Sequence, residues 1–144
     1  MKNLFFIGIL VFSKITNAQE LKFDVKAYTE NSKQGFHEMD KLINSSKGQK
    51  KICDRKYRAN LNEKKLYFYE NGKLDGVLKI NNTIHHNNQL ELIIETSLDE
   101  ANTPTEFIIY IDFSGKKMTS ENISKIKFFW YDPWDDVSYV KRIE

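Results

Sequence analysis

The chain has little of several residues that usually mark a class of protein. Cys53 is the single cysteine among 144 residues. One thiol cannot form an internal disulfide, so an exported protein with this sequence depends on packing rather than on cross-links. The two prolines, Pro104 and Pro133, fall between apolar segments, where they predict loops.

Sequence motifs of catalysis are also absent. There is no Gly-x-Ser-x-Gly elbow, no glycine-rich phosphate loop and no His-Glu-x-x-His pair. His85 and His86 are adjacent and flanked by asparagine, which favours a solvated turn over a metal site. Arg55 lies two residues after Cys53, and a nearby cation is one feature of nucleophilic cysteines, but a buried, inert thiol is the favoured interpretation. We therefore expect no enzyme activity, no metal and no cofactor.

The first 18 residues have the organisation of a secretory signal peptide. Lys2 gives a positive start, residues 4–12 form an apolar run, and Thr16-Asn17-Ala18 supplies the small residues of a cleavage site. The run is about half as long as the roughly 20 residues that a membrane-spanning helix needs. We expect a mature protein that begins at Gln19, lacks a membrane span, and is soluble in the periplasm or outside the cell.

The net charge argues against a nucleic-acid partner. The whole chain has 22 basic and 20 acidic residues, and the basic excess consists of Lys2 and Lys14 within the predicted signal peptide. The remainder is therefore electrically balanced. Nucleic-acid binders usually carry a basic excess, so none is expected here.

Alternation of apolar and polar residues predicts β-strands, most clearly at residues 89–96 and 105–113. Leu90, Leu92 and Ile94 share one face of the first segment, and Ile109 and Ile111 share one face of the second. Side chains alternate between the faces of a strand. Each segment therefore has one buried and one solvated face, and Tyr110 is expected on the solvated one.

Further strands are predicted at residues 21–28, 51–61, 64–70, 77–81, 126–131 and 137–143, the second of these as an edge strand. Turns are predicted at residues 31–35, at Asn71-Gly72, at Asp75-Gly76 and at residues 85–88. In residues 36–44 the apolar residues recur at helical spacing, which predicts one amphipathic helix. Residues 119–122 predict a single helical turn.

These elements predict a mostly β fold in one domain, residues 19–144. About eight short strands with short connections favour an antiparallel meander, forming a small barrel or a curled sheet, with one amphipathic helix after the first strand. Long helical crossovers are absent from the pattern, which argues against a parallel sheet.

Residues 128–136 are the most distinctive stretch, with five aromatic and three acidic side chains. Phe128 and Trp130 suit a core, or an aromatic interior that lines an apolar pocket. Tyr131 and Trp134 suit an exposed rim that contacts a sugar or a protein. With Tyr110 and Trp130, they are the candidate binding residues.

The leading hypothesis is an exported, non-catalytic β domain that binds a small apolar ligand or a protein partner. One alternative is a secreted or periplasmic inhibitor or immunity-type protein that acts through its surface. The other is a small enzyme that uses Cys53.

Overall fold

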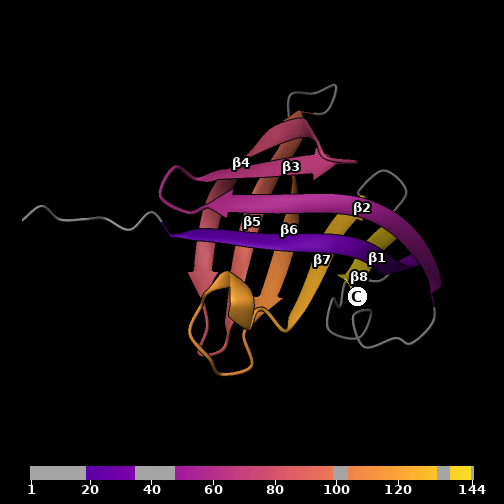
Figure 1. Cartoon of the computed structure of the whole chain (residues 1–144). Helices are drawn as coiled ribbons and strands as arrows, with labels where there is room; N and C mark the ends of the chain where they lie inside the picture. The colour runs from indigo at the N-terminus through magenta and orange to yellow at the C-terminus, as the bar shows by residue number, and fades with distance from the viewer. Residues whose placement is uncertain (1–18, 35–47, 99–103, 133–136, 144) are drawn as a thin grey trace, which may run out of the picture.

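The computed structural model describes residues 19–34, 48–98, 104–132 and 137–143. The strands in these ranges are β1 (Glu20–Gln34), β2 (Gln49–Asn60), β3 (Lys65–Glu70), β4 (Lys73–His85), β5 (Gln89–Leu98), β6 (Pro104–Asp112), β7 (Lys125–Asp132) and β8 (Val137–Ile143). Each strand pairs in antiparallel fashion with the next, and β1 also pairs with β8, so the sheet closes into a barrel. Figure 1 shows β1–β3 running across β5–β7. The predicted antiparallel β meander is confirmed.

The hairpin between β3 and β4 is the turn that the sequence indicated most strongly. Asn71 and Gly72 both have positive φ, 50° and 78°. Two consecutive positive φ angles match the right-handed twist of the flanking strands, and Asn-Gly is the preferred pair for such a turn. The predicted turn is confirmed.

The predicted end of the first strand is wrong. Strand β1 continues through Asn31 to Gln34, where a turn was expected. Its second half pairs with β8, from Tyr28 opposite Ile143 to Gln34 opposite Val137. Closure of the barrel thus supplies backbone partners to a polar stretch that has no strand pattern of its own.

The predicted edge strand is also wrong, because β2 pairs with both β1 and β3. The predicted turn at Asp75-Gly76 is wrong as well, because both residues lie inside β4. The register there moves from Phe68 opposite Gly76 to Tyr69 opposite Leu74, which makes a bulge. A Cβ atom on Gly76 would lie 2.6 Å from a ring carbon of Phe68. The glycine therefore makes room for an aromatic ring.

The predicted helix at residues 36–44 and the predicted signal peptide lie outside the described residues. Within the described ranges, the helical structure is a 3-10 turn, η1 (Ser120–Asn122), at the position predicted for a helical turn. The Thr119 hydroxyl makes no cap to the backbone and instead accepts a hydrogen bond from Asn122 Nδ2. No helix in this part of the chain is long and apolar enough to cross a membrane.

The core fills the interior of the barrel, as the alternation predicted. Leu90, Leu92, Ile94, Ile109 and Ile111 are all 0% exposed. On β1, buried Leu21, Phe23, Val25 and Ala27 alternate with exposed Lys22, Asp24 and Lys26. The strand faces predicted for the central pair are therefore confirmed.

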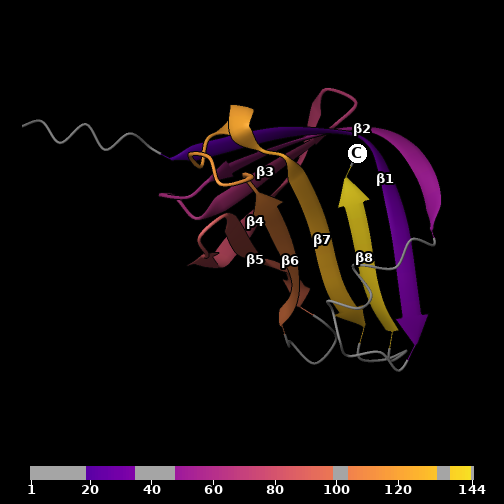
Figure 2. The same cartoon turned by 90° about the horizontal axis from the view of Figure 1, so that it is seen from below.

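One end of the barrel, here called the closed end, is covered by the segment around η1. The Lys22 amide donates to the Ser120 hydroxyl oxygen at 2.8 Å, and Met118 and Ile123 pack against the core. Figure 2 shows η1 beside the start of β1, while β1 and β7 finish at the far end. Most of the buried residues toward η1 are aliphatic, with Phe113 among them, and most of the inward-facing aromatic residues lie toward the far end, here called the aromatic end, together with Val25 and Ala27.

Candidate functional site

Five aromatic rings from five strands meet inside the barrel and are here called the aromatic cluster. They are Phe23 of β1, Tyr57 of β2, Phe68 of β3, Phe107 of β6 and Phe128 of β7. The Tyr57 ring centroid lies 5.1 Å from that of Phe23, 6.5 Å from that of Phe68 and 5.4 Å from that of Phe128. The Phe107 and Phe128 centroids are 5.9 Å apart. These separations fall in the range preferred by aromatic pairs.

Strand register brings these rings together. Phe23 lies directly opposite Tyr57, and Tyr57 lies directly opposite Phe68. Residues that are directly opposite in an antiparallel pair project from the same face. Phe107 is opposite Trp130 in the same way, which places Trp130 on the interior side of β7. The predicted role of Trp130 in an aromatic interior agrees with this position.

Burial is not uniform among the inward-facing residues. The aliphatic residues Leu21, Leu66 and Ile111 are 0% exposed. Tyr57, Phe68 and Phe107 face the same interior but are only half-buried. Solvent therefore reaches three rings of the aromatic cluster, whereas Phe23 and Phe128 are only 6% and 7% exposed.

A pair of opposite charges stands beside the aromatic cluster. Arg55 and Glu70 occupy directly opposite positions on β2 and β3, and Arg55 Nε lies 3.2 Å from Glu70 Oε1. Arg55 is also opposite Val25, which is 2% exposed. This register puts both charged residues on the interior face. The guanidinium also lies close enough to Tyr57 for the two groups to interact electrostatically.

The protonation states of this group follow from burial and charge. Burial raises the pKa of Tyr57 above its ordinary value of 10.0, and the neighbouring Arg55 opposes this effect without cancelling it. Desolvation lowers the pKa of Arg55, but attraction to Tyr57 and Glu70 outweighs that loss, so the pKa is raised. At neutral pH the site therefore presents a neutral hydroxyl beside a permanent cation.

Cys53 lies two residues before Arg55 and is half-buried against the core. Its thiol donates to the Val25 carbonyl oxygen at 3.4 Å. His85 is the last residue of β4 and His86 begins the connection to β5, beside Asp112 and Ser114. Within the described residues, the structure does not bring these histidines to Cys53, and His37 lies outside them.

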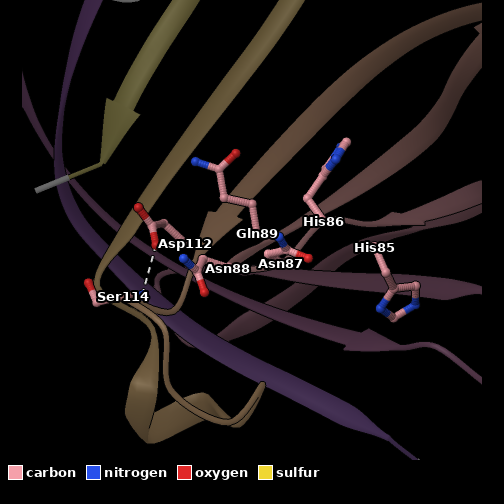
Figure 3. Close-up of a pocket in the computed structure, with 7 residues that line it drawn as sticks. All are labelled: His85, His86, Asn87, Asn88, Gln89, Asp112 and Ser114. Atoms are coloured by element: carbon pink, nitrogen blue, oxygen red, sulfur yellow. Dashed lines mark hydrogen bonds between the residues drawn. The ribbon is translucent and has the colours of Figure 1, made fainter.

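The histidine connection forms an open, polar hollow of about 690 Å³ (Figure 3). Its lining residues are His85, His86, Asn87, Asn88, Gln89, Asp112 and Ser114. His86 Nε2 lies 2.7 Å from Glu91 Oε1, and Figure 3 shows the rings of His85 and His86 pointing apart. The predicted solvated bend is confirmed. No group of three or more His, Cys, Asp or Glu in the described chain could hold a metal ion.

Tyr110 and Trp130 do not form one site. Tyr110 lies on the outer face of β6, opposite Glu91 and Lys127, whereas Trp130 faces the interior. The side chain of Tyr131 and the whole of Trp134 lie outside the described residues. The four predicted binding residues thus divide between an interior and an outer position wherever they can be placed.

The sequence interpretation missed the residues that carry the site: Tyr57, Phe68, Phe107, Arg55 and Glu70. One signal was present, since Arg55 shares its strand face with Cys53, Tyr57 and Ala59. A charge among apolar residues was taken to indicate an edge strand. In the barrel, the charged residue in this pattern, Arg55, faces the interior instead.

Comparisons of the chain with protein-family models, with curated proteins and with solved structures gave no match.

Proposed function

We propose that this is an exported, non-catalytic β-barrel domain that binds a small apolar ligand at the aromatic end. The observation that carries the proposal is the incomplete burial of Tyr57, Phe68 and Phe107, although all three rings face the interior. Small-molecule sites are concave and mostly apolar, with few polar groups to orient the ligand. The aromatic cluster with Arg55 and Glu70 has that composition.

The expected affinity follows from the surface that a ligand would cover. Removing about 400 Å² of apolar surface from water, summed over ligand and protein, is worth about 10 kcal/mol. Lost translational and rotational freedom costs at least about 4 kcal/mol. At most about 6 kcal/mol then remains, which corresponds to a Kd of about 40 µM at the tightest. A small apolar ligand should thus bind with a Kd of tens of micromolar or weaker.

A neutral apolar fluorophore, N-phenyl-1-naphthylamine, tests the proposal. We expect saturable fluorescence enhancement on titration with the purified protein. Phe107→Ala should weaken binding several-fold because its ring belongs to the aromatic cluster. Phe129→Ala is the matched control, because Phe129 is also half-buried but lies on the outer face of β7. Absence of saturable binding, or equal loss in both variants, would contradict the proposal.

Export is proposed from residues 1–18 and has its own test. Expression of the full chain followed by cell fractionation should place the protein outside the cytoplasm. N-terminal sequencing of that fraction should begin at Gln19. A cytoplasmic protein that retains Met1 would contradict this part of the proposal.

A second candidate function is an inhibitor or immunity-type protein that acts through its surface. Exposed apolar side chains on β4 favour it, with Leu74 55% and Val77 46% exposed. Apolar groups on an outer sheet face can anchor a protein partner. Immobilised protein would then retain a partner that the Leu74→Lys/Val77→Lys variant releases and the Phe107→Ala variant keeps. Failure to retain any reproducible partner would argue against this function.

A further inference from the structure

Arg55 brings a positive charge to the edge of the aromatic cluster. Its side chain is 33% exposed, and its guanidinium is bound through Nε by Glu70. A guanidinium has five N–H donors in a planar fork that matches a carboxylate. Nε is engaged by Glu70, so the geometry leaves donors on the terminal nitrogens for a ligand.

We propose, on the basis of the proposed function, that the ligand is an amphipathic carboxylate. Its apolar body lies against the aromatic cluster and its carboxylate binds Arg55. Charge-assisted hydrogen bonds of this kind are about twice as strong as neutral ones. Partial burial strengthens them further, because less water screens the charges.

Glu70 is the member of the ion pair that a ligand can displace from Arg55. Its side chain is 42% exposed, and it is the last residue of β3, directly before the Asn71-Gly72 turn. A ligand carboxylate can take its place while Glu70 turns toward water. Arg55 is the more buried of the two side chains, at 33% exposed. This asymmetry favours an anionic ligand over a cationic one.

Tyr57 supports the same choice. Burial raises its pKa, so its hydroxyl stays protonated at neutral pH and can donate to a carboxylate. Its ring is at the same time the centre of the aromatic cluster, in contact with Phe23, Phe68 and Phe128. One side chain therefore joins the apolar and the polar parts of the site.

Three probes with one apolar body and different head groups test the inference: dodecanoate, dodecanol and dodecylamine. Each is measured by displacement of N-phenyl-1-naphthylamine at pH 7, below its micelle concentration. Hydrogen bonds to a charged group contribute enough to expect at least about a tenfold preference for dodecanoate over dodecanol. Arg55→Gln should abolish this preference, so that dodecanoate and dodecanol bind this variant with equal affinity. Glu70→Gln should tighten dodecanoate binding several-fold, because the competing carboxylate is gone.

The outcomes separate this inference from the proposed function. Equal binding of dodecanoate and dodecanol overturns the carboxylate inference while the apolar site stands. Preference for dodecylamine also overturns it, since Glu70 would then be the recognising group. Failure of the fluorophore and of all three probes to bind overturns the proposed function itself. If Arg55→Gln does not fold, the Arg55→Gln/Glu70→Gln variant, which leaves no unpaired charge, should still lose the preference.

Discussion

Replacing Ile93 or Ile94 with alanine tests the assignment of interior and outer faces. The two residues are neighbours in β5 and project from opposite faces. Ile94 is 0% exposed and lies opposite Ile80 and Phe107. Ile93 is half-buried on the outer face, opposite Ile108. Because the substitution is identical, a difference in stability reports the difference in environment.

The expected cost at Ile94 follows from its complete burial. Alanine lacks three carbons of isoleucine, each worth about 0.8 kcal/mol of transfer free energy, which gives about 2.4 kcal/mol. A cavity at a site that cannot fully collapse adds to this cost, so about 3 to 4 kcal/mol is expected for Ile94→Ala. Ile93 already contacts water, so Ile93→Ala should cost about 1 kcal/mol.

Urea unfolding of both variants, followed by circular dichroism, gives the two free energies of unfolding. Small domains are stable by only about 5 to 15 kcal/mol, so the predicted difference of at least about 2 kcal/mol is readily measured. Comparable m values would show that both variants unfold the same amount of structure. Equal destabilisation, or a larger loss at Ile93, would refute the assigned faces and with them the interior position of the aromatic cluster.

Three further predictions concern the aromatic end. Gly76→Ala should destabilise the protein by about 1 to 3 kcal/mol, because the new methyl meets the Phe68 ring; Phe68→Leu in the same chain should recover part of this loss, and urea unfolding measures both. Stability should fall as pH rises above about 10, because Tyr57 ionises in the unfolded chain while burial keeps it protonated in the folded one. Between pH 9 and pH 11, the free energy of unfolding of Tyr57→Phe should fall less than that of the unmodified protein. An equal fall would contradict the raised pKa. Cys53 is half-buried and its thiol is hydrogen-bonded to the Val25 carbonyl oxygen, so it should react with a maleimide much more slowly in the folded than in the urea-unfolded protein. Fast labelling of the folded protein would favour the enzyme alternative.

The central strands were predictable because their pattern is local. In residues 89–96 and 105–113 every second residue is apolar along most of the segment, with Ile93 and Ile108 as the apolar exceptions on the outer face, and burial of one face on a closed sheet favours that pattern. The Asn71-Gly72 turn was predictable for the same reason, since two residues determine its backbone conformation.

The remaining features depend on partners that are distant in sequence. The second half of β1 becomes a strand because β8 pairs with it. The local sequence around Gly76 predicts a turn, but in the fold Gly76 lies within a strand opposite Phe68, whose ring occupies the space of a side chain. Arg55 looks like a solvated charge until Val25 and Glu70 are placed opposite it. Register, rather than composition, determines where the candidate site lies.

Mapping a bound apolar ligand by nuclear magnetic resonance tests the proposed site most directly. Two-dimensional spectra of the isotope-labelled protein are recorded during a titration with N-phenyl-1-naphthylamine. We predict saturable shifts at Tyr57, Phe68 and Phe107, with little change at Leu90 and Ile111 toward the other end. Shifts confined to the outer face around Leu74 and Val77, or no saturable shifts at all, would contradict a ligand site inside the barrel.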